Sequence, residues 1–281
     1  MPSLAVVRPR VRSLARTALA CVTLFSLGAA AGCTRKSESS GGEPAPAAAA
    51  SPGSSGAAVA AEPTGAPAPG KLGTASIHGV VHFAGKAPEP RPVTTPDPFC
   101  AAQNIKDEDL VVSPTGGLAN VLVHVSQGAV GTYPPPTTEA VVDQTGCMYR
   151  PRVQAVLAGQ TVQIRNSDQT LHNVHSYKGA STLFNQAQIP GGPPMTRTLG
   201  PGGQIIKFRC DVHPWMTGYV GVVSNPFFAV TGADGSFTID KLPPGTYTLE
   251  AWHERAGVKS SAPIAVAEGQ STTAAIELGA P

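Results

Sequence analysis

The chain has 281 residues, of which 20 are Lys or Arg and 18 are Asp or Glu, giving a formal net charge of +2. So small a net charge argues against a nucleic-acid-binding protein, which needs a concentrated basic surface. With 31 Gly, 28 Pro and only 14% charged residues, the composition also excludes a helical bundle or a coiled coil.

The first 32 residues have the features of a secretory signal peptide. Four arginines and no acid in residues 1–16 precede an apolar run over 17–31, which is shorter than the roughly 20 residues that span a bilayer. The run ends before Cys33 and resembles a bacterial lipobox, although Ala30 stands where Leu is commoner. We therefore expect export, lipidation of Cys33 and a periplasmic lipoprotein on a bacterial membrane. The alternative is ordinary signal cleavage, which leaves a soluble periplasmic protein.

Residues 33–74, starting with the lipidated cysteine, have the composition of a disordered tether. Between residues 34 and 70 there is no aromatic residue, and Val59 is the only large aliphatic one. Such a stretch cannot bury enough apolar surface to offset the entropy of folding. It is long enough to hold a folded domain away from a membrane.

From about residue 75 the sequence changes to short runs rich in Val, Ile, Thr and Phe, separated by Gly/Pro turns. This pattern is typical of β-strands, and no amphipathic stretch of helical length interrupts it. We therefore expect an all-β fold of one or two antiparallel sandwiches. The expected strands are 77–83, 119–125, 140–143, 152–157, 161–166, 205–210, 218–223, 236–239, 246–252, 264–267 and 273–278.

A metal-binding pattern ends the strand expected at 205–210. Cys210, His213 and Met216 combine a thiolate, an imidazole and a thioether at spacings of three residues, a donor set that suits copper. A second imidazole is available at His172 or His175. Because residues an odd number apart on a strand point to opposite faces, only one of these two is expected to meet the metal. Zinc is the alternative metal, but zinc sites use Cys, His and carboxylate and leave Met216 unexplained.

Two motifs here, Leu-His-Asn-Val-His at 171–175 and Cys-x-x-His-Pro-Trp-Met at 210–216, together resemble the cupredoxins, most closely the amicyanin and methylamine-utilisation group. The resemblance covers about residues 150–223, with Leu171 in place of that group's proline. It implies a Greek-key sandwich with one type 1 copper ion. The implied ligands are His172, Cys210, His213 and Met216, with Asn173 bracing the cysteine loop.

Together with the expected lipid anchor and tether, this copper site predicts a membrane-tethered electron carrier. His213 would be a partly exposed ligand through which electrons leave. Pro214 and Trp215 would form an apolar docking rim for a redox partner such as a cytochrome, an oxidase or a dehydrogenase. The sequence has no nucleophile or general-base constellation, so we expect no enzyme activity. Two alternatives stay open: a copper storage or delivery protein with the same ligands, and a surface-binding module with a degenerate copper site.

The C-terminal part resembles the carboxypeptidase-regulatory-like modules, also called carbohydrate-binding-like, which are Ig-like sandwiches without catalysis. The resemblance lies in residues 231–249, with the first half of the module at Gly79–Phe83. The cupredoxin segment then lies between the two halves of this sandwich. The expected domains are strands of the sandwich at 75–148, the copper-binding segment at 149–225 and the remaining strands at 226–281.

The odd number of cysteines is accounted for by these assignments. Cys21 leaves with the signal peptide, Cys33 takes lipid and Cys210 binds copper. Cys100 and Cys147 are expected to form a disulfide. The alternative for this pair is a second thiolate metal site, which is disfavoured because neither cysteine has a nearby His in the sequence.

The remaining histidines have no motif. His78, His82 and His124 alternate with apolar residues on expected strands, which predicts that they face solvent. His253 follows Trp252 at a strand end, a pattern more typical of a packed cluster than of a site. Metal roles for His175, His253 and His78 stay open.

Overall fold

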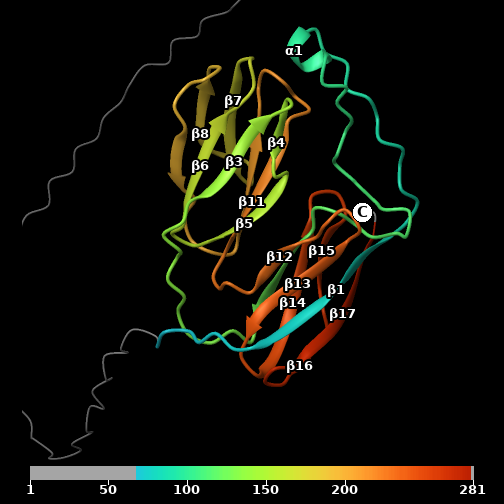
Figure 1. The fold of residues 1–281 in the computed structure, drawn as a ribbon, viewed down its shortest axis with the longest axis vertical. Coiled ribbons are helices and arrows are strands. Elements are labelled where there is room, and N and C mark those ends of the chain that lie inside the picture. Colours follow the sequence, from blue (N-terminus) through green and yellow to red (C-terminus); the bar gives the residue numbers. More distant parts are fainter. Residues whose placement is uncertain (1–67, 280–281) are drawn as a thin grey trace, which may run out of the picture. The chain divides into compact units, whose positions relative to one another are not determined.

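Residues 68–279 are described by the computed structural model, and their secondary structure is almost entirely β-strand (Figure 1). The all-β prediction is thus confirmed. The predicted signal peptide, the lipidated Cys33 and most of the predicted tether lie outside the described residues. Within the described part, no helix is long and apolar enough to cross a membrane.

One sandwich, here called the terminal sandwich, is built from the two ends of the described chain. Its β17 lies parallel to β1, and β13 lies antiparallel on the other side of β1. The first sheet has, in spatial order, β13 (Ser236–Leu242), β1 (Ala75–Ala84) and β17 (Ser271–Gly279). The second sheet has β12 (Phe228–Val230), β2 (Leu122–Gln127), β14 (Gly245–His253) and β15 (Gly257–Ser260), with β16 (Ile264–Val266) beside β14.

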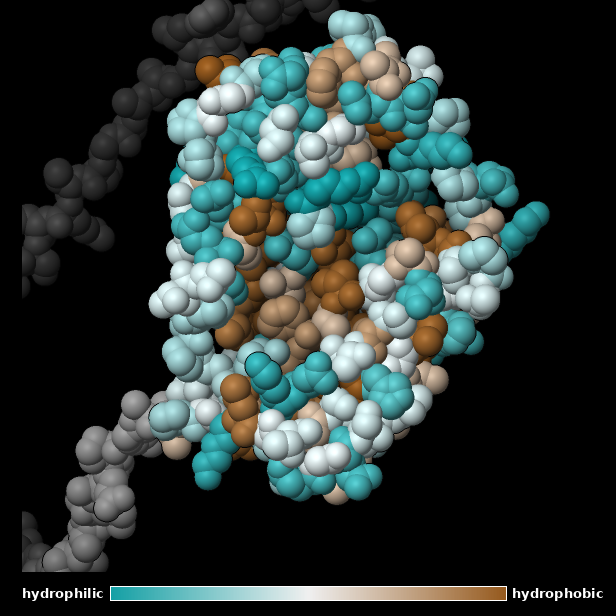
Figure 2. Space-filling view, in the orientation of Figure 1, coloured by the Kyte–Doolittle hydropathy of each residue, from teal (hydrophilic) through white to brown (hydrophobic). Residues whose placement is uncertain are grey.

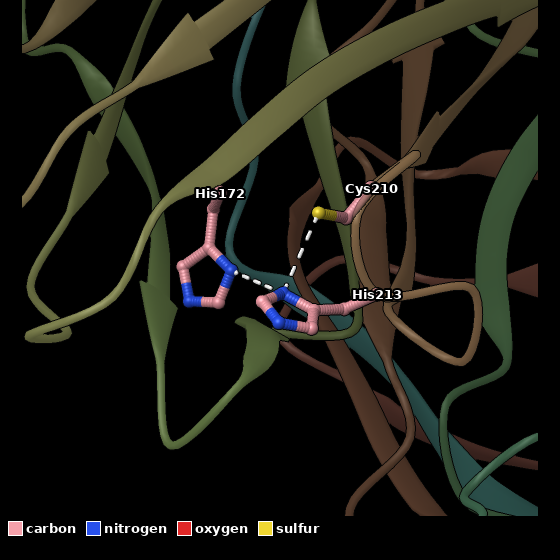
Figure 3. A group of neighbouring side chains, drawn as sticks. All are labelled: His172, Cys210 and His213. Atoms are coloured by element: carbon pink, nitrogen blue, oxygen red, sulfur yellow. Dashed lines mark hydrogen bonds between the residues drawn. The ribbon is translucent and has the colours of Figure 1, made fainter. Parts of the chain in front are cut away.

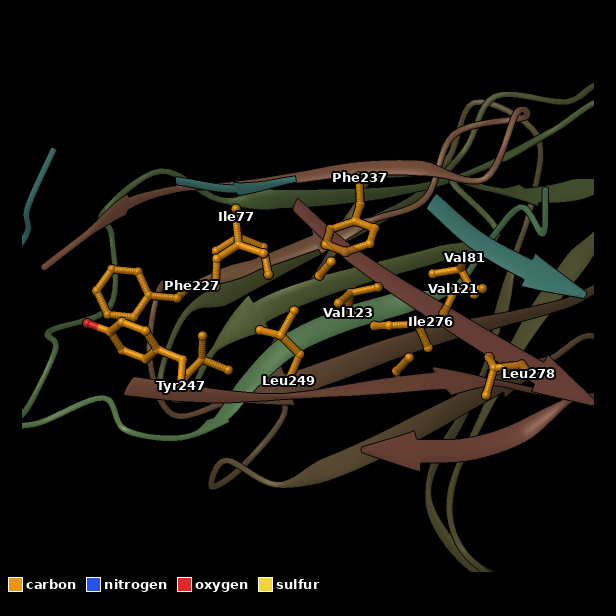
Figure 4. Packing of buried hydrophobic residues seen from close by; sticks show 14 of the residues in the cluster. Ile77, Val81, Val121, Val123, Phe227, Phe237, Tyr247, Leu249, Ile276 and Leu278 are labelled. Atoms are coloured by element: carbon orange, nitrogen blue, oxygen red, sulfur yellow. The ribbon is translucent and has the colours of Figure 1, made fainter. Parts of the chain in front are cut away.

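Alternation along these strands produces the core of the terminal sandwich. Residues two apart on a strand point to the same face, so Ile77 and Val81 of β1 both turn inward. They pack with Phe237 of β13 and Leu249 of β14, and Figure 4 shows these side chains converging between the sheets.

A second sandwich, here called the central sandwich, is inserted between β2 and β12. Its β3–β6 and β5–β11 pairs are parallel, and its other strand pairs are antiparallel. The central sandwich starts at residue 140, earlier than the boundary of 149 suggested by the motifs. One of its sheets has, in spatial order, β5 (Val153–Leu157), β11 (Thr217–Val223), β10 (Gln204–Arg209), β7 (His172–Lys178) and β8 (Ser181–Gln188). The other has β4 (Met148–Arg150), β3 (Ala140–Thr145), β6 (Thr161–Asn166) and β9 (Met195–Thr198).

The two sandwiches meet through a small apolar cluster and a buried ion pair. Leu122 of β2 packs with Tyr219 of β11 in this cluster, and Figure 2 shows apolar side chains gathered in a hollow at this level. Arg152 donates from Nε to Glu254 at 2.6 Å, and the Tyr219 hydroxyl donates to the same carboxylate at 2.9 Å. Both charged side chains are less than 10% exposed. Removal of either partner would leave a buried charge without its counter-charge and would destabilise the junction.

Between β1 and β2 the chain makes a long excursion onto the central sandwich. Residues 91–109, here called the strap, are closed at their base by backbone hydrogen bonds from Val93 N to Ile105 O and from Asp107 N to Arg91 O. The short helix α1 (Pro98–Ala101) forms the tip of the strap. The sequence pattern did not predict this helix, which has only four residues and is too short for a helical period to show.

Candidate metal centre

The ends of two neighbouring strands bring the predicted ligands together. His172 is the first residue of β7, and Cys210 directly follows β10, which pairs antiparallel with β7. His213 and Met216 lie on the short loop from Cys210 to β11. Two backbone hydrogen bonds close that loop, from Met216 N to His213 O at 2.9 Å and from Cys210 N to Met216 O at 3.2 Å.

Three donor atoms converge at this point. Nδ1 of His172 lies 2.9 Å from Nδ1 of His213, which lies 3.8 Å from the Cys210 sulfur (Figure 3). The ligand atoms of these three residues all lie within 4.8 Å of one another, and all three residues are buried. They are thus placed as neighbours although 38 residues separate His172 from Cys210 along the chain.

A carboxylate holds the outer nitrogen of each imidazole. Nε2 of His172 lies 2.8 Å from Asp168 Oδ2, and Nε2 of His213 lies 3.2 Å from Asp97 Oδ2. Hydrogen bonds from Thr170 and from the backbone N–H of Cys100 lower the pKa of Asp97 to about 2. The pKa of Asp168 is lowered too, because hydrogen bonds from His172 and two backbone N–H groups outweigh the effect of burial.

Ionised carboxylates only accept hydrogen bonds, so each Nε2 carries a hydrogen, and each Nδ1 can present a lone pair when its ring is neutral. The two Nδ1 atoms lie 2.9 Å apart in a buried site, a spacing that is satisfied either by a proton on His172 or by a bound metal ion. A carboxylate on the outer nitrogen is also how metal-binding imidazoles are commonly oriented. The donor set therefore fits a metal ion bound by His172, His213 and Cys210.

Protonation of the two imidazoles follows from their contacts. Burial lowers the basicity of His172, but the hydrogen bonds to Asp168 and Cys210 outweigh it and raise its pKa. The pKa of His213 is lowered by burial and by the nearby His172. Two rings this close are not charged together, so His213 stays in the neutral form that binds metals.

Cys210 is placed to ionise. Burial opposes ionisation, but hydrogen bonds from His172 and from the backbone N–H groups of Asn173, His213 and Val212 outweigh it and lower the pKa of the thiol. The Asn173 N–H lies 3.4 Å from the sulfur. The thiolate is the form of cysteine that binds metals, so this surrounding favours a metal ligand.

Met216 and Asn173 both lie close to Cys210 and its loop. Met216 is fully buried in the same core cluster as Cys210. Asn173 accepts a hydrogen bond at Oδ1 from the backbone N–H of Asp211, next to the cysteine. Its amide donates to Asn185 and to the Asp211 carboxylate, so the asparagine ties β7 and β8 to the start of the ligand loop.

One expectation for the loop is corrected by the structure. His213 was expected to be partly exposed, but it is only 2% exposed because Asp97 and Cys100 of the strap lie against its Nε2 edge. Trp215 does not form an open rim either. Its indole N–H donates to Cys147 O at 3.0 Å, and its ring lies 5.1 Å from the His213 ring. Of the predicted rim, only Pro214 is exposed.

The remaining histidines lie apart from the three converging donors. His175 is bound by Asp211 and Thr182 on the outer side of the sheet. His253 is buried and accepts from the backbone N–H groups of Arg255 and Ala256, and burial lowers its pKa to about 4. His78, expected to face solvent, is half-buried and hydrogen-bonds Ser271 and Thr273, whereas His82 is exposed and His124 pairs with Glu250.

Two carboxylates of the site were missed by the sequence reasoning. Asp168 lies four residues before His172, and a carboxylate that near to a metal-binding His is a signal that could have found it. Asp97 lies 116 residues before His213. The predicted Cys100–Cys147 disulfide is confirmed, but the sequence did not indicate that Cys100 lies beside His213. No local pattern reports such distant neighbours.

Comparisons with known proteins cover parts of the chain. The family model described as "Polysaccharide lyase family 4, domain II" matches residues 217–274, which run from β11 to β17. This is a different family from the carboxypeptidase-regulatory-like modules suggested by the sequence. No curated protein matches the chain.

The solved structures similar to this chain include three copper proteins. A purple cupredoxin from Nitrosopumilus maritimus is 25% identical over 30% of this chain and 98% of its own, with a TM-score of 0.27. Amicyanin from Paracoccus versutus is 23% identical over 36% of this chain and 96% of its own, with a TM-score of 0.28. A copper-containing nitrite reductase from Thermus scotoductus is 22% identical over 36% of this chain and 25% of its own, also with a TM-score of 0.28.

Proposed function

We propose that the central sandwich is a cupredoxin domain that binds one type 1 copper ion and exchanges single electrons with a partner protein. The observation that carries this proposal is the convergence of His172 Nδ1, His213 Nδ1 and the Cys210 sulfur. Each imidazole is already oriented by its own carboxylate, so the site is formed before the metal arrives. Bound copper would supply a couple between Cu(I) and Cu(II).

The donor types favour copper over zinc. Two imidazoles, a thiolate and a buried thioether match the blue-copper ligand set, in which Met is the weak axial donor. Structural zinc sites take a fourth Cys, His or carboxylate. The nearby carboxylates, Asp97 and Asp168, are occupied by the outer nitrogens of His213 and His172.

A rigid scaffold supports electron exchange rather than turnover. His172 and Cys210 are held at the ends of paired strands, and the loop to Met216 is closed by backbone hydrogen bonds. Ligand atoms held in this way would change position little between Cu(I) and Cu(II). We therefore infer a carrier without enzyme activity, tethered through Cys33 on the periplasmic side of a bacterial membrane. Its partner would be a cytochrome, an oxidase or a dehydrogenase.

One observation favours a second candidate, a copper storage or delivery protein. Because His213 is covered by the strap, bound copper would be retained, and electrons would have no exposed edge of His213 from which to leave. Electron transfer to a periplasmic cytochrome that outruns Cu(I) transfer to a chelator supports the carrier. The opposite order supports storage.

The match over residues 217–274 supports a role of the terminal sandwich in surface binding, and glycan binding by the copper-free chain tests that role.

Copper titration of the full chain tests the proposed function. Binding to a thiolate should produce intense visible absorption that saturates at one equivalent and is lost in Cys210→Ser. Cys33→Ser is the matched control, since it also removes a cysteine outside the disulfide but lies in the tether, and it should keep the absorption. A colourless wild type, or a coloured Cys210→Ser, overturns the type 1 assignment.

A further inference from the structure

The strap, which the fold does not need to complete either sheet, contacts a predicted metal ligand directly. Asp97 Oδ2 lies 3.2 Å from Nε2 of His213, and the Cys100 sulfur lies 3.7 Å from the same nitrogen. These contacts lie on the side of the ring opposite Nδ1. The edge of His213 that points away from the proposed copper is thus met by the strap instead of by solvent.

Asp97 is held for this contact from several directions. As the N-cap of α1 it accepts at Oδ1 from the backbone N–H groups of Phe99 and Cys100, at 2.8 and 3.0 Å. Its other oxygen accepts from the Thr170 hydroxyl at 2.7 Å, and Thr170 lies two residues before His172. One carboxylate therefore connects the strap, the loop before β7 and the His213 imidazole.

The strap is also fastened to the central sandwich at separate points. The Cys100–Cys147 disulfide joins α1 to the turn before β4. Ile105 is 9% exposed and packs in the central core, and Glu108 pairs with Arg150 of β4 at 2.8 Å. A covalent bond, an apolar contact and an ion pair on one short segment exceed what a loose connection between β1 and β2 requires.

We propose that the strap is a working part of the proposed copper centre: Asp97 is the positioning residue for His213, and the disulfide-fastened α1 closes the centre on that side. The inference rests on the proposed function, because a closed imidazole matters only if His213 binds metal. A redox partner then meets α1 where an uncovered site would present the His213 ring. The strap thus governs both copper retention and the surface across which electrons pass.

Chemical labelling of the metal-free chain tests the closure without depending on copper. Diethyl pyrocarbonate modifies accessible imidazoles, and mass spectrometry locates the product. His213 should be at least tenfold less reactive than the exposed His82 in the wild type, and Cys100→Ala/Cys147→Ala should raise its reactivity toward that of His82. Equal reactivity of the two histidines in the wild type overturns the closure, whether or not copper binds.

Substitution of Asp97 tests the positioning role. This test does not depend on whether the Cys100→Ala/Cys147→Ala variant folds. Asparagine caps helices as well as aspartate does, so Asp97→Asn keeps α1 but removes the charge facing His213. We expect the copper form to keep its visible band, to shift its reduction potential upward and to lose copper to a chelator several-fold faster.

A control within the strap separates positioning from general loosening. Asp107→Asn removes a charge paired with Arg91 at 2.8 Å, away from His213, and should leave the potential at the wild-type value. An unchanged potential and chelation rate in Asp97→Asn, or an equal change in Asp107→Asn, overturns the positioning role. A wild type that binds no copper refutes the proposed function instead, while the labelling result still decides whether the strap closes over His213.

Discussion

Asp168 Oδ2 lies 2.8 Å from Nε2 of His172, and both side chains are almost fully buried. The same carboxylate also accepts from the backbone N–H groups of Gly146 and Cys147 at 2.7 Å. The Asp168 carboxylate is therefore fixed to the turn between β3 and β4, and it holds the ring of His172, the first of the proposed imidazole ligands.

Removal of the negative charge of Asp168 should weaken metal binding. Asp168→Asn keeps the size of the side chain but leaves His172 without an anionic acceptor for its Nε2–H. Changes to such outer partners commonly cost 10–100-fold in metal affinity, and we expect a loss of about that size for copper. Competition with a chelator of known affinity measures it, with Asp240→Asn on the exposed side of β13 as the control. An affinity within twofold of the wild type contradicts the prediction.

The buried His253 should make folding sensitive to acid. Burial and the nearby Arg152 and Arg255 lower its pKa to about 4 from the usual 6.5. Between these values the unfolded chain binds a proton that the folded chain does not. The free energy of unfolding therefore falls as the pH drops from about 6.5 to about 4, by up to about 3 kcal/mol from this residue.

Urea unfolding of the metal-free chain across that pH range measures the effect. His253→Asn provides the matched control, since its amide oxygen can accept the backbone N–H bonds from Arg255 and Ala256 but does not titrate. The stability of the wild type should fall more steeply with acid than that of the variant. Parallel pH profiles would show that His253 is not the group responsible.

The regular alternation of the sequence was sufficient to predict most strands. Thr161–Asn166 forms β6 with the predicted limits, and Ile77–Phe83 lies within β1. The strands missed include β8, where seven of eight residues are at least partly exposed and no apolar alternation marks the strand. β8 forms because it pairs along one edge with β7, and such pairing is a property of the tertiary structure.

The candidate site, like the fold, was predicted only in part from the sequence. The two motifs placed His172, Cys210 and His213 together because strand ends and a short loop are local features with a recognisable spacing. The cover over His213 could not be predicted, because Asp97 reaches it from a strap 116 residues earlier in the chain. Exposure of a ligand depends on distant segments that pack over it, and a local motif carries no information about them.

The buried ion pair at the junction should be important for stability. Glu254 accepts from Arg152 and from the Tyr219 hydroxyl, so Glu254→Ala leaves a buried guanidinium without its counter-charge. Removal of one partner of such a pair typically costs about 3–5 kcal/mol. Tyr219→Phe, which removes one hydrogen bond, should cost about 1–2 kcal/mol. Urea unfolding measures both, with Glu277→Ala at an exposed position of β17 as a control that should change little.

Met216 provides a test of the axial position. Met216→Leu replaces the thioether by an apolar side chain of similar volume, so the fold should be kept. The three remaining donors should still produce the thiolate-to-copper absorption. The reduction potential should rise, because loss of a weak axial donor disfavours Cu(II) more than Cu(I). Met195 is buried in the same core cluster, so Met195→Leu makes an equivalent change and should leave the potential at the wild-type value. An unchanged potential in Met216→Leu would mean that the thioether does not contact the metal, and the ligand set would then consist of His172, Cys210 and His213 alone.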